Sequence, residues 1–469
     1  AMRRLAALLC VAGAARGGHE VVELDAPGKV AYRVARDLDG DGRDELLLVA
    51  RHEIRLWRGR PEGPARHCDA ALPMPEGAAL FDVSDLDGDG KTAEIVVRTA
   101  EAYWALAEGS PPRRLECRSG RGLPPDPATV LWRALLADLD RDGKPDLVDV
   151  SLDGYRIDYG GGGSRTLPAM ARESAETFAQ AETERRVARV ALPAWTQGDF
   201  DGDRVPDFAV VTESGLVVHP GDAAGRHDPG RSFLVDLPEA ASADLHFRDL
   251  NRDGWMDALA VDRAAGEAYV LVAEGEPGLR KPARALLSVN GTLRQPVLED
   301  FDGDGLPDLA LPYFPDPTVQ DAVRWFVRGE VLIEVPVFLN RGRTRCIRRP
   351  ADTRVTIPIK IRVSADAGGR FSVSGLVVVE YGGDLDGDGR KDLVVTESPD
   401  RLAVHRGVPV TVFHEDANAS IAVPDASAYD SVASAAAETN GDGRSDIIVH
   451  YRGAGRRPDR VFLLRSGKE

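Results

Sequence analysis

The sequence predicts an all-β protein that folds as a β-propeller of eight four-stranded blades, with seven blades as the alternative. An acidic loop recurs eight times along the chain, and the interval between the sixth and the seventh loop is longer than the others. The usual period is about 50 residues, which is the length of one four-stranded propeller blade. Short apolar runs rich in Val, Ile and Leu flank the loops, and none of these runs reaches helix length.

Composition supports this fold class. The 469 residues include 48 Gly and 31 Pro, which favours many strands and turns over a helical bundle. Hydrophobic residues make up 43% of the chain and are spread along it, which excludes a disordered protein.

The N-terminal segment, residues 1–18, has the features of a secretory signal peptide. Arg3 and Arg4 precede an apolar stretch from Leu5 to Ala15, and small residues follow. We therefore expect an exported protein whose residues 19–469 form a single propeller domain, located outside the cell, at the cell surface or in the periplasm. No later apolar run reaches the roughly 20 residues that a membrane-spanning helix needs, so we expect no membrane span.

Each repeat reads as a strand, an acidic loop, a strand, a tight turn and a strand, followed by a more variable fourth strand. The last repeat stops after its third strand, near Val461–Leu464, whereas Glu20–Leu24 is an extra strand before the first repeat. We predict that this N-terminal strand completes the last blade and thereby removes exposed sheet edges.

Two segments interrupt the period, near residues 165–190 and 315–375. Ala169–Arg186 is rich in helix-favouring residues, and Asp321–Ser374 contains extra strand-like runs that include Glu330–Leu339 and Thr356–Val363. We expect both segments to be insertions between strands on one rim of the propeller.

The cysteines are compatible with export. Cys10 would leave with the signal peptide, so that Cys68, Cys117 and Cys346 would stay. A Cys68–Cys117 disulfide is conceivable, but sequence does not establish the pairing. The paired spacing typical of a zinc site is missing.

The acidic loop has the chemistry of a calcium site. In the pattern D-x-D-x-D-G-x-x-D, the side chains at positions 1, 3, 5 and 9 and the carbonyl oxygen at position 7 are the predicted ligands. Oxygen ligands in this number suit Ca²⁺, and glycine at position 6 permits the sharp turn. An EF-hand would need glutamate at position 12 and flanking helices, but position 12 is apolar in every loop except the third, where it is Asp149. Mg²⁺ would prefer fewer protein ligands and more water.

Eight loops give up to eight Ca²⁺ sites, and in the second loop one extra residue makes Glu94 the last ligand. The predicted ligands, with the position-7 residue contributing its carbonyl, are Asp37, Asp39, Asp41, Arg43 and Glu45; Asp85, Asp87, Asp89, Lys91 and Glu94; Asp138, Asp140, Asp142, Lys144 and Asp146; Asp199, Asp201, Asp203, Val205 and Asp207; Asp249, Asn251, Asp253, Trp255 and Asp257; Asp300, Asp302, Asp304, Leu306 and Asp308; Asp384, Asp386, Asp388, Arg390 and Asp392; and Glu438, Asn440, Asp442, Arg444 and Asp446.

The charge follows from these loops. Eight divalent ions would offset nearly all of the formal net charge of -17, so the acidity reflects metal ligation. Without metal the clustered carboxylates would repel one another, and we therefore expect calcium to stabilise the fold. We expect a carbohydrate or a cell-surface protein as the partner and no nucleic acid.

These loops, each leading into a strand such as DELLLV, DLVVTE or DIIVHY, resemble the FG-GAP and VCBS repeat families, the former of which includes the propeller of integrin α chains. The resemblance implies an exported calcium-binding β-propeller, commonly linked to adhesion or carbohydrate binding. The Phe-Gly and Gly-Ala-Pro signatures of the first family are not evident, and Glu438 and Asn440 make the eighth loop the weakest match.

Two other functions compete with a non-catalytic recognition or adhesion module. The second loop is similar to segments of the calcium-bearing propellers of rhamnogalacturonan lyases, so a polysaccharide lyase is one alternative. We find no H-E-x-x-H, G-x-S-x-G or phosphate-binding glycine motif, and the nine histidines show no ligand spacing, so we expect no enzyme. The other alternative is a structural subunit of a cell-surface assembly. The six tryptophans recur once per repeat in several blades, where they pack between sheets or stack on sugars.

Overall fold

The structure is a computed structural model that describes residues 19–89, 91, 94–115, 130–151, 154–168, 172–180, 183–191, 194–212, 215–237, 244–273, 278–280, 282–342, 347, 350–360, 362–365, 371–374, 379–408, 412–413, 417 and 419–466. The expected signal peptide at residues 1–18 lies outside these residues. Cys117 and Cys346 lie outside them as well, so the cleavage site and the disulfide pairing stay predictions.

Eight blade sheets follow one another along the chain: six have four antiparallel strands, one has a fifth strand that pairs in parallel, and one has six strands. Blades 1 to 4 consist of β2 (Tyr32–Arg36), β3 (Glu45–Val49), β4 (Glu53–Trp57) and β5 (Ala70–Pro73); β6 (Ala78–Ser84), β7 (Glu94–Thr99), β8 (Tyr103–Leu106) and β9 (Arg113–Leu115), with β10 (Leu131–Trp132) added parallel to β6; β11 (Leu136–Ala137), β12 (Asp146–Ser151), β13 (Gly154–Asp158) and β14 (Ser164–Pro168); and β17 (Trp195–Gly198), β18 (Asp207–Thr212), β19 (Gly215–His219) and β20 (Phe233–Asp236).

Blades 5 to 8 complete the set. They consist of β21 (Leu245–Arg248), β22 (Asp257–Asp262), β23 (Glu267–Val272) and β24 (Ala283–Ser288); β26 (Val297–Glu299), β27 (Asp308–Ala310), β29 (Glu330–Phe338) and β30 (Thr353–Lys360), extended by β28 (Tyr313–Pro315) and β25 (Gly291–Leu293); β33 (Val379–Gly383), β34 (Asp392–Ser398), β35 (Arg401–His405) and β38 (Ala419–Ala422); and β39 (Ser431–Ala437), β40 (Asp446–Arg452), β41 (Arg460–Arg465) and β1 (Glu20–Leu24). Two short 3₁₀ turns lie at Pro229–Arg231 and Gly278–Arg280.

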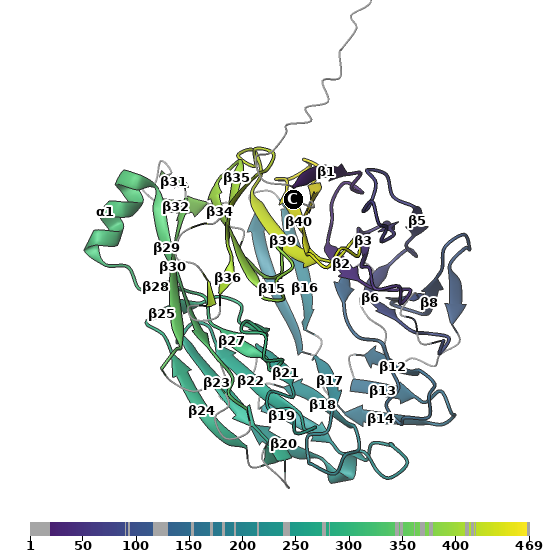
Figure 1. Ribbon diagram of the computed structural model, residues 1–469. Coiled ribbons are helices and arrows are strands. Elements are labelled where there is room, and N and C mark those ends of the chain that lie inside the picture. The colour runs from purple at the N-terminus through teal and green to yellow at the C-terminus, as the bar shows by residue number, and fades with distance from the viewer. Residues whose placement is uncertain are drawn as a thin grey trace, which may run out of the picture.

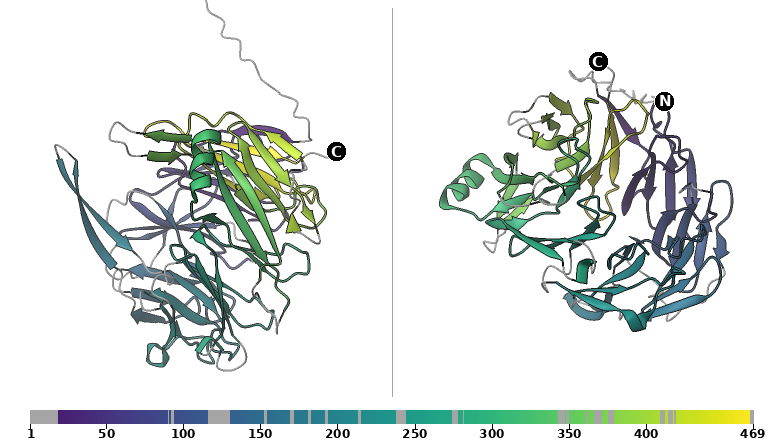
Figure 2. Two further views of the ribbon diagram at one scale, coloured as in Figure 1. Left: turned by 90° about the vertical axis from the view of Figure 1, so that its left-hand side faces the viewer. Right: turned by 60° about the horizontal axis from the view of Figure 1, so that its bottom comes forward.

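The sheets are arranged in a ring (Figure 1). In the right-hand view of Figure 2 the colour advances around this ring in chain order, and the two ends of the chain meet. First strands of adjacent blades contact one another, as β2 does with β39 and β39 with β33, so the first strands form the inner wall. The prediction of an all-β propeller with eight blades is therefore confirmed.

The N-terminal strand closes the ring as predicted. β1 pairs antiparallel with β41, in a register that runs from Glu20 opposite Arg465 to Leu24 opposite Val461. The guanidinium of Arg460 donates to both carboxylate oxygens of Glu23, at 2.6 and 2.9 Å. Joining the two ends within one blade pairs an edge that would otherwise be open.

The core consists of apolar side chains packed between neighbouring blades. Leu47 and Val49 of blade 1, for example, belong to the same buried cluster as Phe81 and Val83 of blade 2. Each fully buried side chain of this kind stabilises the fold by about 1.5–3 kcal/mol. Trp57 is fully buried in the cluster that joins blades 8 and 1, as expected for a tryptophan that packs between sheets.

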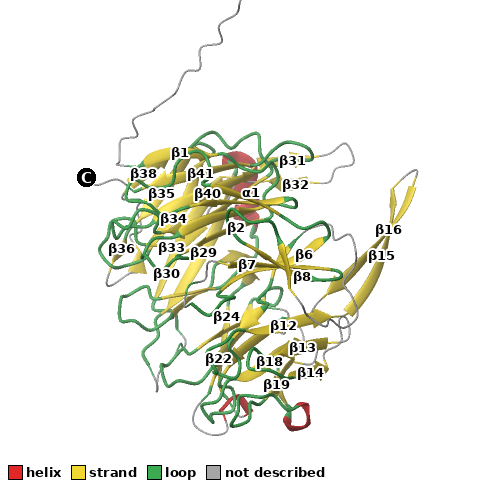
Figure 3. Ribbon diagram, turned by 90° about the vertical axis from the view of Figure 1, so that its right-hand side faces the viewer, coloured by secondary structure: helices red, strands yellow, loops and turns green. Residues whose placement is uncertain are grey.

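The first insertion is a strand hairpin, although many of its residues favour helix. It forms a two-stranded hairpin of β15 (Arg172–Gln180) and β16 (Thr183–Ala191), with Arg172 opposite Ala191 and Gln180 opposite Thr183. The hairpin projects away from the blades in the left view of Figure 2 and in Figure 3. Helix propensity is a weak preference, and a segment that folds back on itself satisfies its backbone groups by pairing its two halves.

The second insertion contains the strand-like runs that were predicted, together with a helix that was not. Besides β29 and β30 it contains α1 (Val319–Arg328) and the hairpin of β31 (Arg362–Ala365) and β32 (Phe371–Ser374). A separate, smaller hairpin of β36 (Gly407–Val408) and β37 (Val412–Phe413) lies between β35 and β38 in the chain. The N–H of Thr318 donates to Asp321 at 2.9 Å and the N–H of Asp321 donates back to the Thr318 hydroxyl at 3.3 Å. This reciprocal cap is the sequence signal that would have predicted α1. Among the described residues, no helix combines the length and apolar character needed to cross a bilayer.

Candidate metal centre

The eight acidic loops occupy equivalent places in the eight blades. Each loop starts directly after the first strand of its blade, and its position-9 residue opens the second strand, as Asp37 and Glu45 do in blade 1. Because every blade is built in the same order around one ring, the loops gather on the same face of the propeller.

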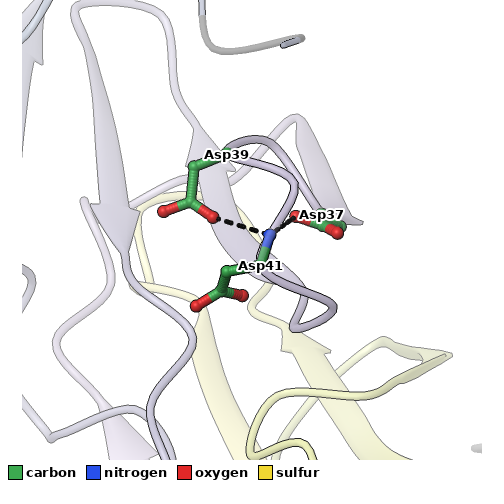
Figure 4. A group of neighbouring side chains, drawn as sticks. All are labelled: Asp37, Asp39 and Asp41. Carbon is green, nitrogen blue, oxygen red and sulfur yellow. Dashed lines mark hydrogen bonds between the residues drawn. The ribbon is translucent and has the colours of Figure 1, made fainter.

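Within a loop, the carboxylates at positions 1, 3 and 5 converge. In the first loop, one oxygen from each of Asp37, Asp39 and Asp41 lies within 4.8 Å of the others. Figure 4 shows these three side chains around the turn, with the N–H of Asp41 donating to Asp37 and Asp39 at 3.2 Å each. The same convergence holds for Asp85, Asp87 and Asp89; Asp199, Asp201 and Asp203; and Asp300, Asp302 and Asp304. In the third loop the converging group is Asp138, Asp140 and the position-9 residue Asp146.

Backbone N–H groups hold these carboxylates in place. Asp37 accepts from Gly40 at 2.7 Å and from Gly42 at 2.9 Å. In all eight loops the position-5 carboxylate accepts the N–H of the position-7 residue, at 2.8 to 3.0 Å. A carboxylate has about four lone-pair sites, which is more than the backbone N–H groups named here occupy. That the position-7 carbonyl is a further ligand stays a prediction.

The loop backbone is left-handed at positions 4 and 6. Gly40 and Gly42 have φ of 79° and 84°, values that glycine adopts without steric cost. Among the described residues, the three non-glycine residues with positive φ are Arg141, Arg204 and Arg252, and all of them lie at these two positions of acidic loops. A side chain held in this conformation costs about 1–2 kcal/mol, so the turn is retained even where glycine is missing.

The position-9 carboxylate has a structural role that the sequence did not reveal. In six loops it accepts two backbone N–H groups at 2.8 to 3.1 Å, one from position 2 and one from the end of the third strand. Glu94 accepts the position-2 N–H of Leu86 at 3.0 Å, so it takes this place in the second loop despite the extra residue. In the eighth loop, Asp446 accepts the Thr439 hydroxyl and the N–H of Ser466 at 2.8 Å.

Burial shifts the acidity of these carboxylates. Removal from water raises the pKa of Asp207, Asp257 and Asp308 to about 7, although the backbone N–H groups that donate to them act in the opposite direction. Burial likewise raises the pKa of Asp146 and Asp392 to about 6. A cation close to such a group would favour its ionised form.

Neighbouring loops are bonded to one another. The position-8 N–H of one loop donates to the position-1 carbonyl of the preceding loop: Met256 to Asp199 at 2.8 Å, Ser445 to Asp384 at 2.6 Å, and Asp44 to Glu438 at 2.6 Å. The side chains of Arg141 and Arg252 reach in the other direction and donate to the position-6 carbonyls of the following loops, Arg204 and Gly305. These bonds connect loops 3 to 6 into one group and loops 7, 8 and 1 into another.

The eight loops are not electrostatically equal. Arg280 lies 3.5 Å from Asp201, and Arg406 lies 3.3 Å from Asp386, so a guanidinium already faces the position-3 carboxylate in loops 4 and 7. In the fifth loop the amide of Asn251 donates to Asp253 at 2.9 Å. These groups reduce the negative charge available to a cation in these loops.

Asp149, the one acidic residue at position 12, belongs to a different feature. It lies on β12, fully buried, and Oδ1 of its carboxylate accepts from Nε of the fully buried Arg98 on β7 of the neighbouring blade at 3.2 Å. The Tyr103 hydroxyl donates to the same carboxylate at 2.8 Å. Asp149 is therefore an inter-blade ion-pair partner that replaces the apolar residue of the other repeats.

The donor set of the loops fits a hard divalent cation. Three carboxylates whose oxygens lie within 4.8 Å repel one another without a cation, and oxygen-only sites with several carboxylates match the coordination of Ca²⁺. The residues at positions 1, 3 and 5 would hold the ion, and position 9 would orient the loop around it.

Comparison with known proteins identifies the repeat. FG-GAP-like repeats match residues 37–97, 249–311 and 384–449, each of which starts at the first residue of an acidic loop. No curated protein gives a significant match. Among solved structures, the chain is similar to BBS1N in complex with ARL6DN, with 12% identity and a TM-score of 0.40 over 96% of this chain and 95% of that chain. It is also similar to the V. cholerae biofilm matrix protein Bap1, with 14% identity and a TM-score of 0.28 over 96% of this chain and 88% of that chain. The chain is thus an eight-bladed β-propeller that contains FG-GAP-like repeats in the three matched segments.

Proposed function

We propose that this chain is an exported, calcium-binding β-propeller that acts as a non-catalytic recognition or adhesion module. The observation that carries the proposal is the repeated convergence of carboxylates at the acidic loops, held by the same backbone N–H groups from blade to blade. Calcium would remove the repulsion within each loop and stiffen the bonded groups of loops, which leaves the propeller as a rigid platform for a partner.

Export fits this use of calcium. Extracellular calcium modules bind at about 10⁻⁴–10⁻³ M, so that loops of this kind fill outside the cytosol. The apolar stretch after Arg3 and Arg4 supports the same location.

Two buried histidines are held by contacts within the fold. Burial lowers the pKa of His227 and of His450 to about 4, so both rings are neutral at physiological pH. His227 lies against Tyr159 at 3.1 Å, and His450 lies between Arg33 at 2.9 Å and Asp459 at 3.0 Å. Both rings are held by contacts within the fold, as packing residues are.

The partner class is a carbohydrate or a cell-surface protein, and a depletion assay distinguishes the two. The protein lacking the segment 1–18 is mixed, with calcium, with a panel of insoluble acidic and neutral polysaccharides, and the supernatant is assayed for protein and for the ultraviolet absorbance of unsaturated uronides. We expect calcium-dependent depletion without product. Uronide release would contradict the non-catalytic proposal and favour a polysaccharide lyase. Absence of both depletion and product would exclude these carbohydrates and leave a protein partner or a structural role in an assembly.

A further inference from the structure

One tryptophan on the inner wall of the propeller is exposed. β10 (Leu131–Trp132) pairs parallel with β6, with Trp132 opposite Phe81, and it lies on the side of β6 that faces away from the other strands of blade 2. β10 therefore takes the innermost place in its blade. The side chain of Trp132 is 38% exposed, and it is the one exposed aromatic group among the side chains that the structure describes.

The open part of the indole is the side that does not face Phe81. The ring of Trp132 stacks on the fully buried ring of Phe81, with 6.1 Å between the ring centroids and 21° between the planes. Because Phe81 covers one face of the indole, the exposure comes from the other face and from the edge. A tryptophan that only packs between sheets is covered on both faces, as the fully buried Trp57 is.

Hydrogen bonds fix the segment that follows Trp132. The carboxylate of Asp82, which is 5% exposed, accepts the N–H of Leu135 at 2.7 Å. From blade 4, the indole N–H of Trp195 donates to the carbonyl of Ala134 at 2.9 Å. The exposed ring is thus presented by a segment that is held from two blades, and such preorganisation lowers the cost of binding a ligand.

A polar hollow begins two residues after Trp132. It has a volume of about 400 Å³, within the range of small-ligand sites, and is lined by Ala134, by the end of β6 and by parts of the second and third acidic loops. The side chains of Arg36 and Lys144 also line it, and neither forms a hydrogen bond or an ion pair with any residue that the structure describes. Both cations can therefore donate to a ligand.

The surroundings of Trp132 favour a sugar over a protein surface. A protein partner generally docks on a contiguous apolar patch. The other exposed large apolar side chains among the described residues lie elsewhere, on outer strands or on α1: Val21, Leu234, Leu286 and Val327. Trp132 is thus an isolated aromatic ring next to polar groups.

A sugar ring matches this combination. Its C–H groups form an apolar face that packs on an indole, and its hydroxyl groups need both hydrogen-bond donors and acceptors. The hollow supplies donors from Arg36 and Lys144 and acceptors from Asp85 and Asp138.

We propose that the open face of Trp132 stacks on one ring of a carbohydrate partner and that the adjoining hollow holds the next ring. This inference rests on the carbohydrate recognition proposed above and names the residue that carries it. The same ring chemistry occurs in neutral and in uronate-containing oligosaccharides, and in the latter Arg36 and Lys144 would pair with the carboxylates.

The test is titration calorimetry on the protein lacking the segment 1–18, in the presence of calcium. The probes are oligosaccharides of galacturonate and of mannuronate, and neutral oligosaccharides of glucose, galactose and mannose. Trp132→Ala should weaken the binding of the best probe by about 10-fold or more, and Trp132→Phe by about 3-fold, because the smaller ring still offers a face for stacking. Leu286→Ala, which removes an exposed apolar side chain on the outer strand of blade 5, is the control and should leave binding unchanged.

Quenching of tryptophan emission by acrylamide shows whether the ligand covers the ring itself. A bound oligosaccharide should reduce the quenching in the unmodified chain. The reduction should be lost in Trp132→Phe, which still binds the ligand but has no indole at this position. This second measurement keeps the test decisive if Trp132→Ala fails to fold.

The outcomes separate this inference from the proposed function. Unchanged affinity in Trp132→Ala, or unchanged protection from acrylamide in Trp132→Phe, would overturn the role of Trp132 while carbohydrate recognition stands. If none of the probes binds the unmodified chain, carbohydrate recognition fails and the stacking site fails with it. Binding that depends on Trp132 supports the proposal, and the preferred probe identifies the ligand as neutral or acidic.

Discussion

Replacing Asp149 by leucine should destabilise the protein by about 3–5 kcal/mol, the cost typical of breaking a buried ion pair by removing one partner. The substitution removes the acceptor for Nε of Arg98 at 3.2 Å and for the Tyr103 hydroxyl at 2.8 Å. The guanidinium left behind is fully buried, and its Nη2 already has no hydrogen-bond partner among the described residues. A charge in that position has neither water nor an anion to compensate it.

Replacing both partners should have a much smaller effect. In the double variant Arg98→Met with Asp149→Leu, no buried charge is left, and such apolar replacements are often neutral or stabilising. The coupling energy between the two sites should therefore be about 3 kcal/mol. As a surface control, Asp158→Asn removes the partly exposed partner of Arg156 and should cost less than about 1 kcal/mol.

The assay is urea unfolding at constant calcium, followed by tryptophan fluorescence, for the unmodified chain, both single variants, the double variant and the surface control. The reasoning would be refuted if Asp149→Leu lowered the free energy of unfolding no more than Asp158→Asn does, or if the double variant were as unstable as the sum of the single variants.

Two further predictions concern pH and the loop turns. Burial and the adjacent Arg33 lower the pKa of His450 to about 4, below its value of about 6.5 in an unfolded chain, so this residue alone should contribute a loss of about 1.4 kcal/mol per pH unit as the pH falls from about 6.5 towards 4. Buried carboxylates with a raised pKa, such as Asp207, contribute with the opposite sign in this range, so the measurement is the difference between the unmodified chain and His450→Asn in urea unfolding at several pH values. An unchanged slope in the variant would contradict the assignment. Arg204 has a φ of 68° at a position where other loops have glycine, so Arg204→Gly should be neutral or stabilise the protein by up to about 1 kcal/mol, whereas Gly42→Ala should destabilise it by about 1–2 kcal/mol. The melting temperatures of the two variants check this. A lower melting temperature for Arg204→Gly together with a higher one for Gly42→Ala would show that the loop turn is not the source of strain.

The blades could be predicted from the sequence because each one repeats a local pattern. All parts of this pattern lie within about 20 residues: the turn residues, the spaced carboxylates and the flanking apolar runs. The distance between successive repeats gives the length of one blade. Closure by Glu20–Leu24 could be predicted for the same reason, since the last repeat lacks one strand.

The features that the sequence did not reveal depend on contacts between distant segments. Asp149 stood out as the acidic exception at its position, but its partner Arg98 lies in another blade and is found only in the fold. The wall around Trp132 combines residues of blades 2 and 4, which no local pattern brings together. The residues of the first insertion favour helix, but the segment Arg172–Ala191 forms a hairpin, because pairing between its two halves outweighs that propensity.

Calcium binding at the acidic loops is tested by a thermal melt combined with a count of bound metal. Metal is first removed with EDTA from the protein lacking the segment 1–18. One sample is then returned to calcium chloride at a concentration well above the expected dissociation constant, and a second sample is left without metal. The melting temperature and the calcium bound per chain at equilibrium are measured for both samples. For a dissociation constant of about 10⁻⁴ M and about 5 mM calcium, each occupied loop should add about 2 kcal/mol of stability. The account predicts several bound ions per chain, up to eight, and a higher melting temperature with calcium. Asp300→Asn with Asp302→Asn should remove about one ion, whereas Asp316→Asn, outside the loops, should remove none. No bound calcium and an unchanged melting temperature would contradict the account.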